Sequence, residues 1–204
     1  MIEAHHGKAH GRGLPGLLLE LVMIGVGVFL GLMAEQWRES RQHHELAMEA
    51  IRNFRTELAS NAAHVKAFVP YHDSLRVAVD RFVAEPGPHT FTRFQREASF
   101  HGIAPVTFEH TAWDLALATQ SLAYLDPKLA YRVSVVYTTQ AAFQTYENAF
   151  IQTAFAPSTF AHGDDATGLT QSLASYMGDV ALNEPMLLKQ YDALIPALDS
   201  ALGR

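Results

Sequence analysis

The sequence contains no cysteine, which excludes disulfides, thiolate metal sites and cysteine nucleophiles. Charged residues make up only 18% of the chain, below the roughly 25% that is typical of soluble domains. The formal net charge of −6 gives no basic surface for nucleic acid. No stretch alternates apolar and polar residues over the length of a strand. These absences predict an all-α protein whose charge is diluted by a lipid-facing segment.

Enzyme signatures are also missing. The chain has no HExxH or repeated ExxH pattern for a metal, no GxSxG nucleophile turn and no glycine-rich phosphate loop. Three of the 11 histidines, His5, His6 and His10, lie in a glycine-flanked tail, which lacks the rigidity of a dedicated metal site. His43 and His44 are adjacent and point about 100° apart on a helix. We therefore expect no enzymatic activity and no catalytic, cofactor-binding or metal-binding residues.

The longest apolar run extends from Leu17 to Ala34 and has Glu20 as its sole charged residue. As a helix this run would reach about 27 Å, close to the thickness of a bilayer's hydrocarbon core. A cleaved signal peptide would have a shorter apolar core and a small-residue exit, and a buried helix of a soluble protein would carry a polar stripe. The run therefore predicts a transmembrane helix over residues 14–37, after a flexible tail of residues 1–13.

Both ends of this helix carry residues suited to a membrane interface. Glu20 lies a few residues after Pro15, near the positive end of the helix dipole and within reach of water. A sharper alternative is that Glu20 pairs with a cation of a neighbouring helix or carries a proton within an assembly. Trp37, followed by Arg38 and Arg41, is expected at the headgroup level of the opposite interface.

Gly27 and Gly31 form a GxxxG pattern inside the run. Two bare backbone patches on one helix face permit close approach of a second helix. Glycine is common in transmembrane helices, so the pattern also arises by chance. We expect a helix–helix contact here, either homotypic or with another membrane protein.

The orientation of the helix follows from its layout more than from its charges. Lys8 and Arg12 on one side nearly balance Arg38 and Arg41 on the other, so the positive-inside rule decides little. A short tail, one anchor and a long C-terminal domain are typical of an uncleaved signal anchor. We expect the tail in the cytoplasm and the domain on the other side of the membrane.

Beyond Trp37 the helical pattern continues. Residues 38–84 predict a long amphipathic stalk helix that can break at Pro70, and the breaker Glu85-Pro86-Gly87-Pro88 ends it. Residues 85–204 predict a helical bundle domain of about four or five further helices packing on the stalk. The apolar face of the stalk comprises Leu46, Ala50, Phe54, Leu58, Ala62, Val65 and Val69.

The bundle helices can be bounded from the same patterns. Asp126 and Pro127 are a helix cap followed by a first-turn proline, and Asn183-Glu184-Pro185 is expected to start the last helix. The expected helices cover residues 91–100, 107–125, 127–155, 169–182 and 183–202, with a loop over 156–168.

Thr111-Ala112-Trp113-Asp114 is the most distinctive motif of this region. It is typical of a helix start in which Thr111 and Asp114 form a capping box and Trp113 enters the core, together with Leu117 and Leu122. The functional alternative is that Trp113, Thr119 and Tyr124 line a groove between helices.

The chain resembles a family of uncharacterised bacterial single-pass inner-membrane proteins. Those proteins have a short tail, an anchor with an early Glu and a terminal Trp, and an all-helical domain with a TAWD-type motif. The matching stretches are Glu20 to Val28 with Gln36-Trp37, Leu58-Ala59-Ser60-Asn61, Thr111 to Thr119, Leu125-Asp126 and Val136-Tyr137. In that family a glycine usually follows the Thr of the third motif, where this chain has Gln120. The resemblance implies the architecture and the membrane location but no activity.

Two classes of function fit these features. The first is a non-enzymatic single-pass membrane protein that acts as an oligomeric or accessory scaffold subunit through helix–helix contacts. Its partners would be the lipid bilayer and either a second copy or other membrane-protein subunits, without nucleic acid. The second is an extracytoplasmic helical sensor or small-ligand-binding domain. A sensor needs an output module, and the sixteen residues before Leu17 provide none, which favours the first class.

Overall fold

The computed structural model describes residues 14–161 and 163–203. The tail of residues 1–13, with its predicted flexibility and its three histidines, lies outside the described residues. The helices are α1 (Leu14–Ala84), α2 (Phe91–Glu97), α3 (Thr111–Ala118), α4 (Pro127–Ala154) and α5 (Thr167–Ala201), with short 3₁₀ helices at Ser121–Tyr124 and Pro157–Phe160. The described part of the chain has no strand beyond an isolated bridge between Thr90 and Asp165. The all-α prediction is confirmed.

The chain forms two compact units, Met1–Glu45 and Leu46–Arg204. In the first unit, the large apolar side chains between Leu14 and Met33 are 48% to 81% exposed. The second unit contains the hydrophobic core, which begins at Ala47. From Leu46 onward, α1 supplies one of the core helices of the bundle.

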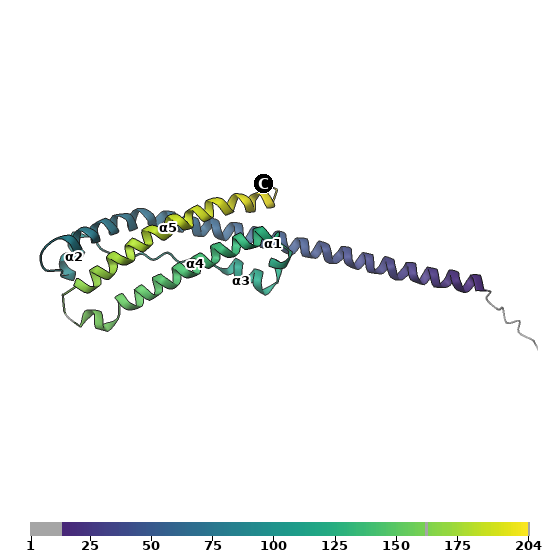
Figure 1. Ribbon diagram of the computed structural model, residues 1–204, viewed down its shortest axis with the longest axis horizontal. Helices are drawn as coiled ribbons and strands as arrows, with labels where there is room; N and C mark the ends of the chain where they lie inside the picture. The colour runs from purple at the N-terminus through teal and green to yellow at the C-terminus, as the bar shows by residue number, and fades with distance from the viewer. Residues whose placement is uncertain (1–13, 162, 204) are drawn as a thin grey trace, which may run out of the picture. The chain divides into compact units, whose positions relative to one another are not determined.

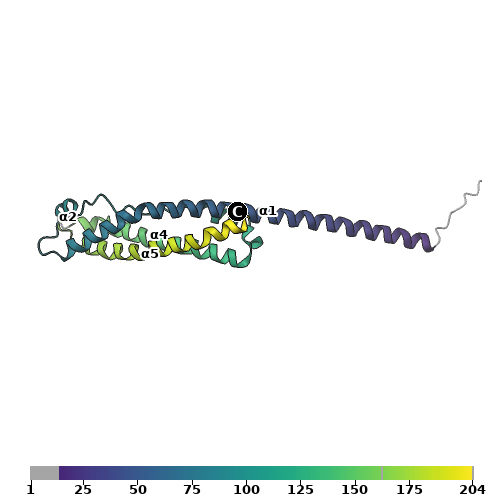
Figure 2. The same cartoon turned by 90° about the horizontal axis from the view of Figure 1, so that it is seen from above.

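Three long helices run side by side in the second unit, namely the part of α1 after Leu46, α4 and α5 (Figures 1 and 2). Arg55 near the start of this part of α1 bonds Asp199 near the end of α5, with 3.0 Å between Nε and Oδ1. Further along α1, His72 bonds Glu184. Since the residue numbers rise on one helix as they fall on the other, α1 and α5 are antiparallel.

The same reasoning orients α4. Gln140 of α4 bonds Tyr191 of α5, and Glu147 bonds Tyr176, so α4 and α5 are also antiparallel. The short helix α2 lies at the end of the bundle where α5 begins (Figure 1), held there by a backbone bond of 2.8 Å from the Phe91 N–H to the Asp164 carbonyl.

Each long helix buries a stripe with alternating steps of three and four residues, the 3.5-residue period of helices that pack closely along their length. Most stripe positions are apolar, and a few polar residues interrupt them. On α1 the stripe is Ile51, Phe54, Leu58, Asn61, Val65, Phe68, His72, Leu75, Val79 and Phe82; on α4 it is Leu129, Val133, Val136, Gln140, Phe143, Glu147, Phe150 and Ala154; on α5 it is Leu173, Met177, Val180, Glu184, Leu187, Tyr191, Leu194 and Leu198.

Prolines do not end the long helices. The possible break at Pro70 is absent, and the prediction of a helix boundary at residues 183–185 is wrong, because α1 and α5 continue through Pro70, Pro185 and Pro196. A proline inside a helix removes one backbone hydrogen bond and costs about 3 kcal/mol. All three prolines are exposed, and the buried stripe packs on both sides of each, so tertiary packing offsets the local cost.

The region between α2 and α4 is less helical than predicted. The helix expected over residues 91–100 ends at Glu97, and the one expected over 107–125 is reduced to α3 and a 3₁₀ turn. Residues 98–110 are instead an irregular segment in which Ser99, Gly102 and Ala104 have positive φ. These left-handed residues stop helical hydrogen bonding before Pro105.

Asp126 caps α4 as predicted, since its carboxylate accepts from the N–H groups of Lys128 and Leu129 at 3.0 Å.

Contacts around α3 differ from the sequence prediction in two respects. The predicted capping box at Thr111 does not form, because Asp114 accepts from the ring of His110 instead. Leu117 is 52% exposed, so its prediction as a core residue is also wrong. Ala112 and Ala116 face the core in its place, and Trp113 and Leu122 are only partly buried against it.

Gln120 follows α3 with a left-handed backbone, at φ 57° and ψ 18°. This conformation costs an L-residue about 1–2 kcal/mol relative to glycine. Gln120→Gly should therefore raise the free energy of unfolding by about 0.5–1 kcal/mol after the larger entropy of the unfolded glycine chain is counted. Thermal unfolding of the detergent-solubilised chain measures this. Gln120→Ala keeps the Cβ and is the matched control, expected to leave stability unchanged. A lower melting temperature for Gln120→Gly than for Gln120→Ala would contradict the backbone explanation.

Candidate functional site

The residues predicted to contact the membrane lie on the apolar N-terminal part of α1. Within Gly16–Ala84 an 18-residue window has a mean hydropathy of 2.4 and none of it is buried, so by length and composition this helix can cross a membrane. Glu20, Gly27 and Gly31 are exposed on it. A Cβ built on either glycine meets no atom within 4 Å, so the glycines are not required by packing within the chain. Trp37 is 65% exposed, and the Arg41 guanidinium lies 5.2 Å from its ring centroid.

The predicted groove residues do not come together. Trp113 is stacked on Tyr137 with 5.2 Å between ring centroids and lines a cavity beside α4. Thr119 lines a different, smaller cavity beside the start of the α1 stripe, near Ala50, and its hydroxyl bonds the Leu115 carbonyl. Tyr124 is 38% exposed and lines neither cavity. Of the three residues of this alternative, Trp113 alone lines the cavity beside α4.

Polar side chains of the long helices hold the irregular segment 98–110 in place. On the α1 side, the Nε2 atom of His72 lies 3.0 Å from the carbonyl oxygens of both Ile103 and Ala104. Asn61 accepts from the Glu109 N–H at 2.9 Å and donates to the Glu109 carbonyl at 2.8 Å. A segment without helical hydrogen bonds must pair its buried backbone groups elsewhere, and these side chains supply the partners.

His72 also holds a proton against Glu184. Carbonyl oxygens only accept, so the Nε2 atom of His72 must carry a hydrogen, and its Nδ1 atom lies 2.6 Å from the Glu184 carboxylate. Two acceptors would repel at that distance, which means that a second proton lies between the Nδ1 atom of His72 and the Glu184 carboxyl group. Burial lowers the pKa of His72, but the hydrogen bond and the charge of Glu184 outweigh it, and the pKa is raised overall. Both side chains are 3% exposed.

Glu147 lies beside this pair in the core. Its Oε1 atom accepts from the Val106 N–H and from the Tyr176 hydroxyl, each at 3.2 Å, and Gln144 donates to its Oε2 atom at 3.4 Å. Burial raises the pKa of Glu147 to about 7 despite these donors and the nearby charge of His72. Glu147 thus ties α4, α5 and the irregular segment together, and it changes protonation near neutral pH.

A further buried carboxylate, Glu57, holds the start of α3. It accepts from the Ala112 N–H at 2.8 Å and from the Tyr137 hydroxyl at 2.7 Å. Burial is the main cause of the raised pKa of Tyr137, and the hydrogen bond and charge of Glu57 add to it. Glu57 therefore occupies the positive N-terminal end of α3 and sets the position of Tyr137 next to Trp113.

The larger apolar cavity of about 490 Å³ lies between the irregular segment, α3 and α4. Phe108, Trp113 and Tyr137 form its aromatic wall, and its polar lining includes Gln140 and Asp114. Gln140 is 3% exposed, and its Nε2 atom donates to the Tyr191 hydroxyl at 2.6 Å. Its Oε1 atom is buried without a hydrogen-bond partner. Buried polar atoms are rarely left unpaired, so this one requires an explanation.

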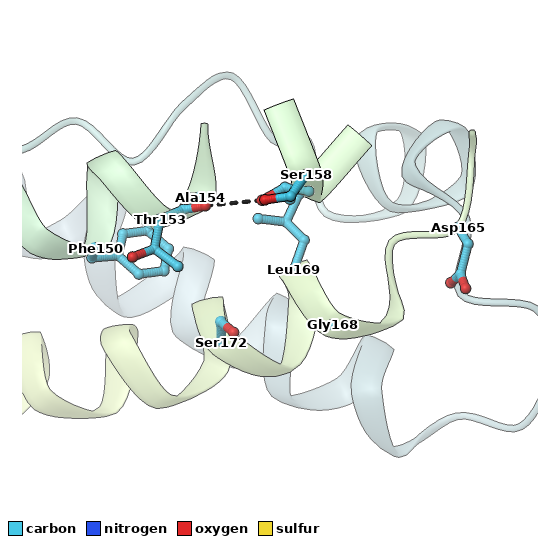
Figure 3. Close-up of a pocket in the computed structure, with 9 residues that line it drawn as sticks. Phe150, Thr153, Ala154, Ser158, Asp165, Gly168, Leu169 and Ser172 are labelled. Atoms are coloured by element: carbon cyan, nitrogen blue, oxygen red, sulfur yellow. Dashed lines mark hydrogen bonds between the residues drawn. The ribbon is translucent and has the colours of Figure 1, made fainter. Parts of the chain in front are cut away.

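A second cavity of about 450 Å³ lies where α4 ends and α5 begins, lined by Phe150, Thr153 and Ser172 among others (Figure 3). Two of its polar side chains are engaged locally. The Thr159 hydroxyl donates to the Thr153 carbonyl at 2.9 Å. Asp165 accepts from the N–H and hydroxyl of Thr167.

Within residues 14–161 and 163–203, no group of three His, Cys, Asp or Glu side chains lies close enough to hold a metal ion. Comparison with known proteins gave no further guide: no family model, curated protein or solved structure matches the chain. The candidate site therefore rests on the geometry of the chain itself.

Sequence reasoning missed the buried residues that organise this region, namely Glu57, Asn61, His72, Gln140, Glu147 and Glu184. A usable signal exists, because His72, Gln140 and Glu147 occupy stripe positions where an apolar residue is expected. The sequence does not predict which of these side chains pair with one another, because the paired residues lie on different helices.

The protonation of Glu147 predicts a pH dependence of stability. Its pKa is raised in the folded chain, so its contribution to stability is present below the unfolded pKa, near 4.5, and is lost as the pH rises through about 7. His72, whose pKa is also raised, acts in the same direction. We expect the free energy of unfolding to fall by about 1.4 kcal/mol between about pH 6 and about pH 8.5 through Glu147.

Glu147→Gln cannot ionise, so it should flatten this profile and raise stability at the alkaline end. Chemical unfolding at both pH values, followed by circular dichroism, measures the change. Asp192→Asn removes a carboxylate that is 67% exposed and should leave the slope as it is in the wild type. An equal slope in the wild type and in Glu147→Gln would refute the role of Glu147.

Proposed function

We propose that the chain is a non-enzymatic, single-pass protein of the bacterial inner membrane that acts as an oligomeric or accessory subunit through helix–helix contacts. The observation that carries the proposal is the apolar surface of α1 between Leu14 and Met33, where every large apolar side chain is at least 48% exposed. A continuous apolar surface of this size is unfavourable in water. Lipid and a neighbouring membrane helix are the environments that suit it.

The details of this surface support membrane insertion. Glu20 lies near the N-terminal end of the helix, where water is in reach. Trp37, with Arg41 over its ring, suits the headgroup region of the other interface. The resemblance to single-pass inner-membrane proteins and the signal-anchor layout favour a cytoplasmic N-terminus and a periplasmic helical domain.

Gly27 and Gly31 support association. They lie four residues apart, so they share one face of the helix, and neither is needed by packing within the chain. Small residues at this spacing allow the backbones of two membrane helices to approach closely. The partner on this face is a second copy of the chain or a helix of another membrane protein.

A second candidate function is a small-ligand-binding domain. The observation that favours it is the cavity of about 490 Å³, which is within the usual size of ligand pockets and is lined by a buried glutamine with an unpaired oxygen. Membrane anchoring and ligand binding are compatible, since they use different parts of the chain.

Membrane insertion and orientation can be tested together. Alkaline carbonate should leave the intact chain in the membrane pellet, and deletion of residues 14–37 should release it, because the deleted stretch is the apolar surface described above. A reporter fused after Arg204 that is active only in the periplasm should be active. Extraction of the intact chain by carbonate would contradict insertion, and activity of only a cytoplasmic reporter would reverse the orientation.

Association through the glycine face can be tested by the double substitution Gly27→Leu and Gly31→Leu. The segment stays apolar and helical, and the larger side chains meet no atom of the same chain, so insertion should survive. Loss of a close helix contact should weaken association by about 1–2 kcal/mol, or roughly five- to thirtyfold. Cross-linking in membranes measures it for the full chain and for residues 1–45.

Gly25→Leu is the matched control, because residue 25 lies about 200° around the helix from residue 27 and is equally open. It should leave cross-linking unchanged. If the double substitution cross-links as strongly as the wild type, the contact lies elsewhere. If neither form cross-links to itself, a mild-detergent pull-down with mass measurement identifies whether another subunit occupies the face.

A further inference from the structure

The cavity beside Trp113 has the lining of a site for a small organic cation. Three aromatic side chains, those of Phe108, Trp113 and Tyr137, contribute to its wall. Trp113 and Tyr137 are stacked at an interplanar angle of 27°, and Phe54 packs behind both. Aromatic rings held in this way are rigid, and their faces attract apolar groups and cations.

The charges around the cavity are negative. Among its lining residues Asp114 is acidic and none is lysine or arginine. The ring of His110, also in the lining, bonds Oδ2 of Asp114 at 2.7 Å, so a bound cation would share this carboxylate with His110. The buried Glu57 carboxylate lies directly behind Tyr137. The charges of Glu57 and Asp114 both add to the effect of burial in raising the pKa of Tyr137, which shows that their field reaches the aromatic wall. A cation is favoured in such a field and an anion is opposed.

An anion is also excluded at the nearest position that would attract one. The N-terminal end of α3 borders the cavity at Trp113 and Asp114. Its exposed N–H groups would favour a negative charge, but Glu57 already accepts from the Ala112 N–H at 2.8 Å. The helix end is therefore neutralised from inside the protein.

Gln140 is a polar residue of the cavity wall and is 3% exposed. Its amide nitrogen donates to Tyr191 of α5, which is outside the cavity lining. Its oxygen is buried without a donor, so it is a cost to the core of about 1–3 kcal/mol and a ligand in the cavity does not reach it.

We propose that this cavity binds a small organic ammonium ion whose apolar or aromatic body lies against Trp113 and Tyr137 and whose N–H groups face Asp114. The site goes beyond membrane anchoring and helix association, and it requires neither. The cavity volume of about 490 Å³ accommodates a one-ring amine.

The chain supplies its own reporter for this site. It contains 2 tryptophans, Trp37 and Trp113. In the variant Trp37→Phe all tryptophan fluorescence therefore comes from Trp113 in the cavity wall. The full chain in a non-ionic detergent is titrated with 2-phenylethylammonium and, separately, with 2-phenylethanol. These probes share the ring and a hydrogen-bond donor and differ in charge. In the control variant Trp113→Phe the fluorescence comes from Trp37, and a change in it measures any effect of the probes on the detergent.

The expected result is a saturable change of Trp113 emission, at least about fivefold tighter for 2-phenylethylammonium than for 2-phenylethanol, with no change of Trp37 emission. Equal affinity for the two probes would overturn the cation assignment. The absence of a saturable change with either probe, or an equal change from Trp37, would overturn the site. None of these outcomes affects the test of membrane insertion.

Two variants locate the charged nitrogen. Asp114→Asn, at a side chain that is 60% exposed, should weaken 2-phenylethylammonium about three- to fivefold and leave 2-phenylethanol unchanged. Asp80→Asn, on α1 and outside the cavity lining, is the matched control and should alter neither. Unchanged binding in Asp114→Asn would overturn the proposed position of the charge.

Discussion

A polar group left unpaired inside a helical core costs about 1–3 kcal/mol. Each long helix of this bundle has polar side chains on its buried stripe, and these side chains therefore need hydrogen-bond partners. Asn61 and His72 interrupt the stripe of α1, Gln140 and Glu147 that of α4, and Glu184 that of α5. Most of their partners come from the irregular segment 98–110 and from one another. The bundle and this segment therefore depend on each other, since neither satisfies its buried polar groups alone.

This dependence also fixes the register of the helices. An apolar stripe with a 3.5-residue period can slide by one heptad with little change in packing. The pair His72–Glu184, buried to 3% exposure on both sides, and the contact of Glu147 with Tyr176 form at one register only. Breaking such a buried pair costs several kcal/mol because it leaves a charge without a partner. The polar positions thus select one alignment from those that the apolar positions allow.

The cavity beside Trp113 is a consequence of the same arrangement. A continuous helix over residues 107–125 would have packed its own apolar face against α4. Instead, Asn61 and Glu57 fix the chain at Glu109 and Ala112, and α3 begins only there. Small residues, Ala112 and Ala116, then face the core, and Trp113 lies at its edge against Tyr137. The aromatic wall is held in position, and space remains in front of it.

The sequence by itself determined what depends on local or one-dimensional patterns. The absence of strand alternation predicted the helical fold, the run from Leu17 to Ala34 predicted the exposed apolar part of α1, and Asp126 with Pro127 predicted the start of α4. Each of these follows from residues within a few turns of one another, where helix period, capping and hydropathy act directly.

Only the tertiary structure decided the rest. Pro70 and Pro185 remain within helices because packing on both sides outweighs a lost backbone bond. Gln120 takes a left-handed conformation where glycine would be favoured, since the turn between α3 and the following 3₁₀ helix requires it. His72 meets Glu184 across 112 positions of sequence, and Trp113 meets Tyr137 rather than Thr119 or Tyr124. Such encounters are set by which helices lie side by side and at which register, and no periodicity within a single helix contains that information.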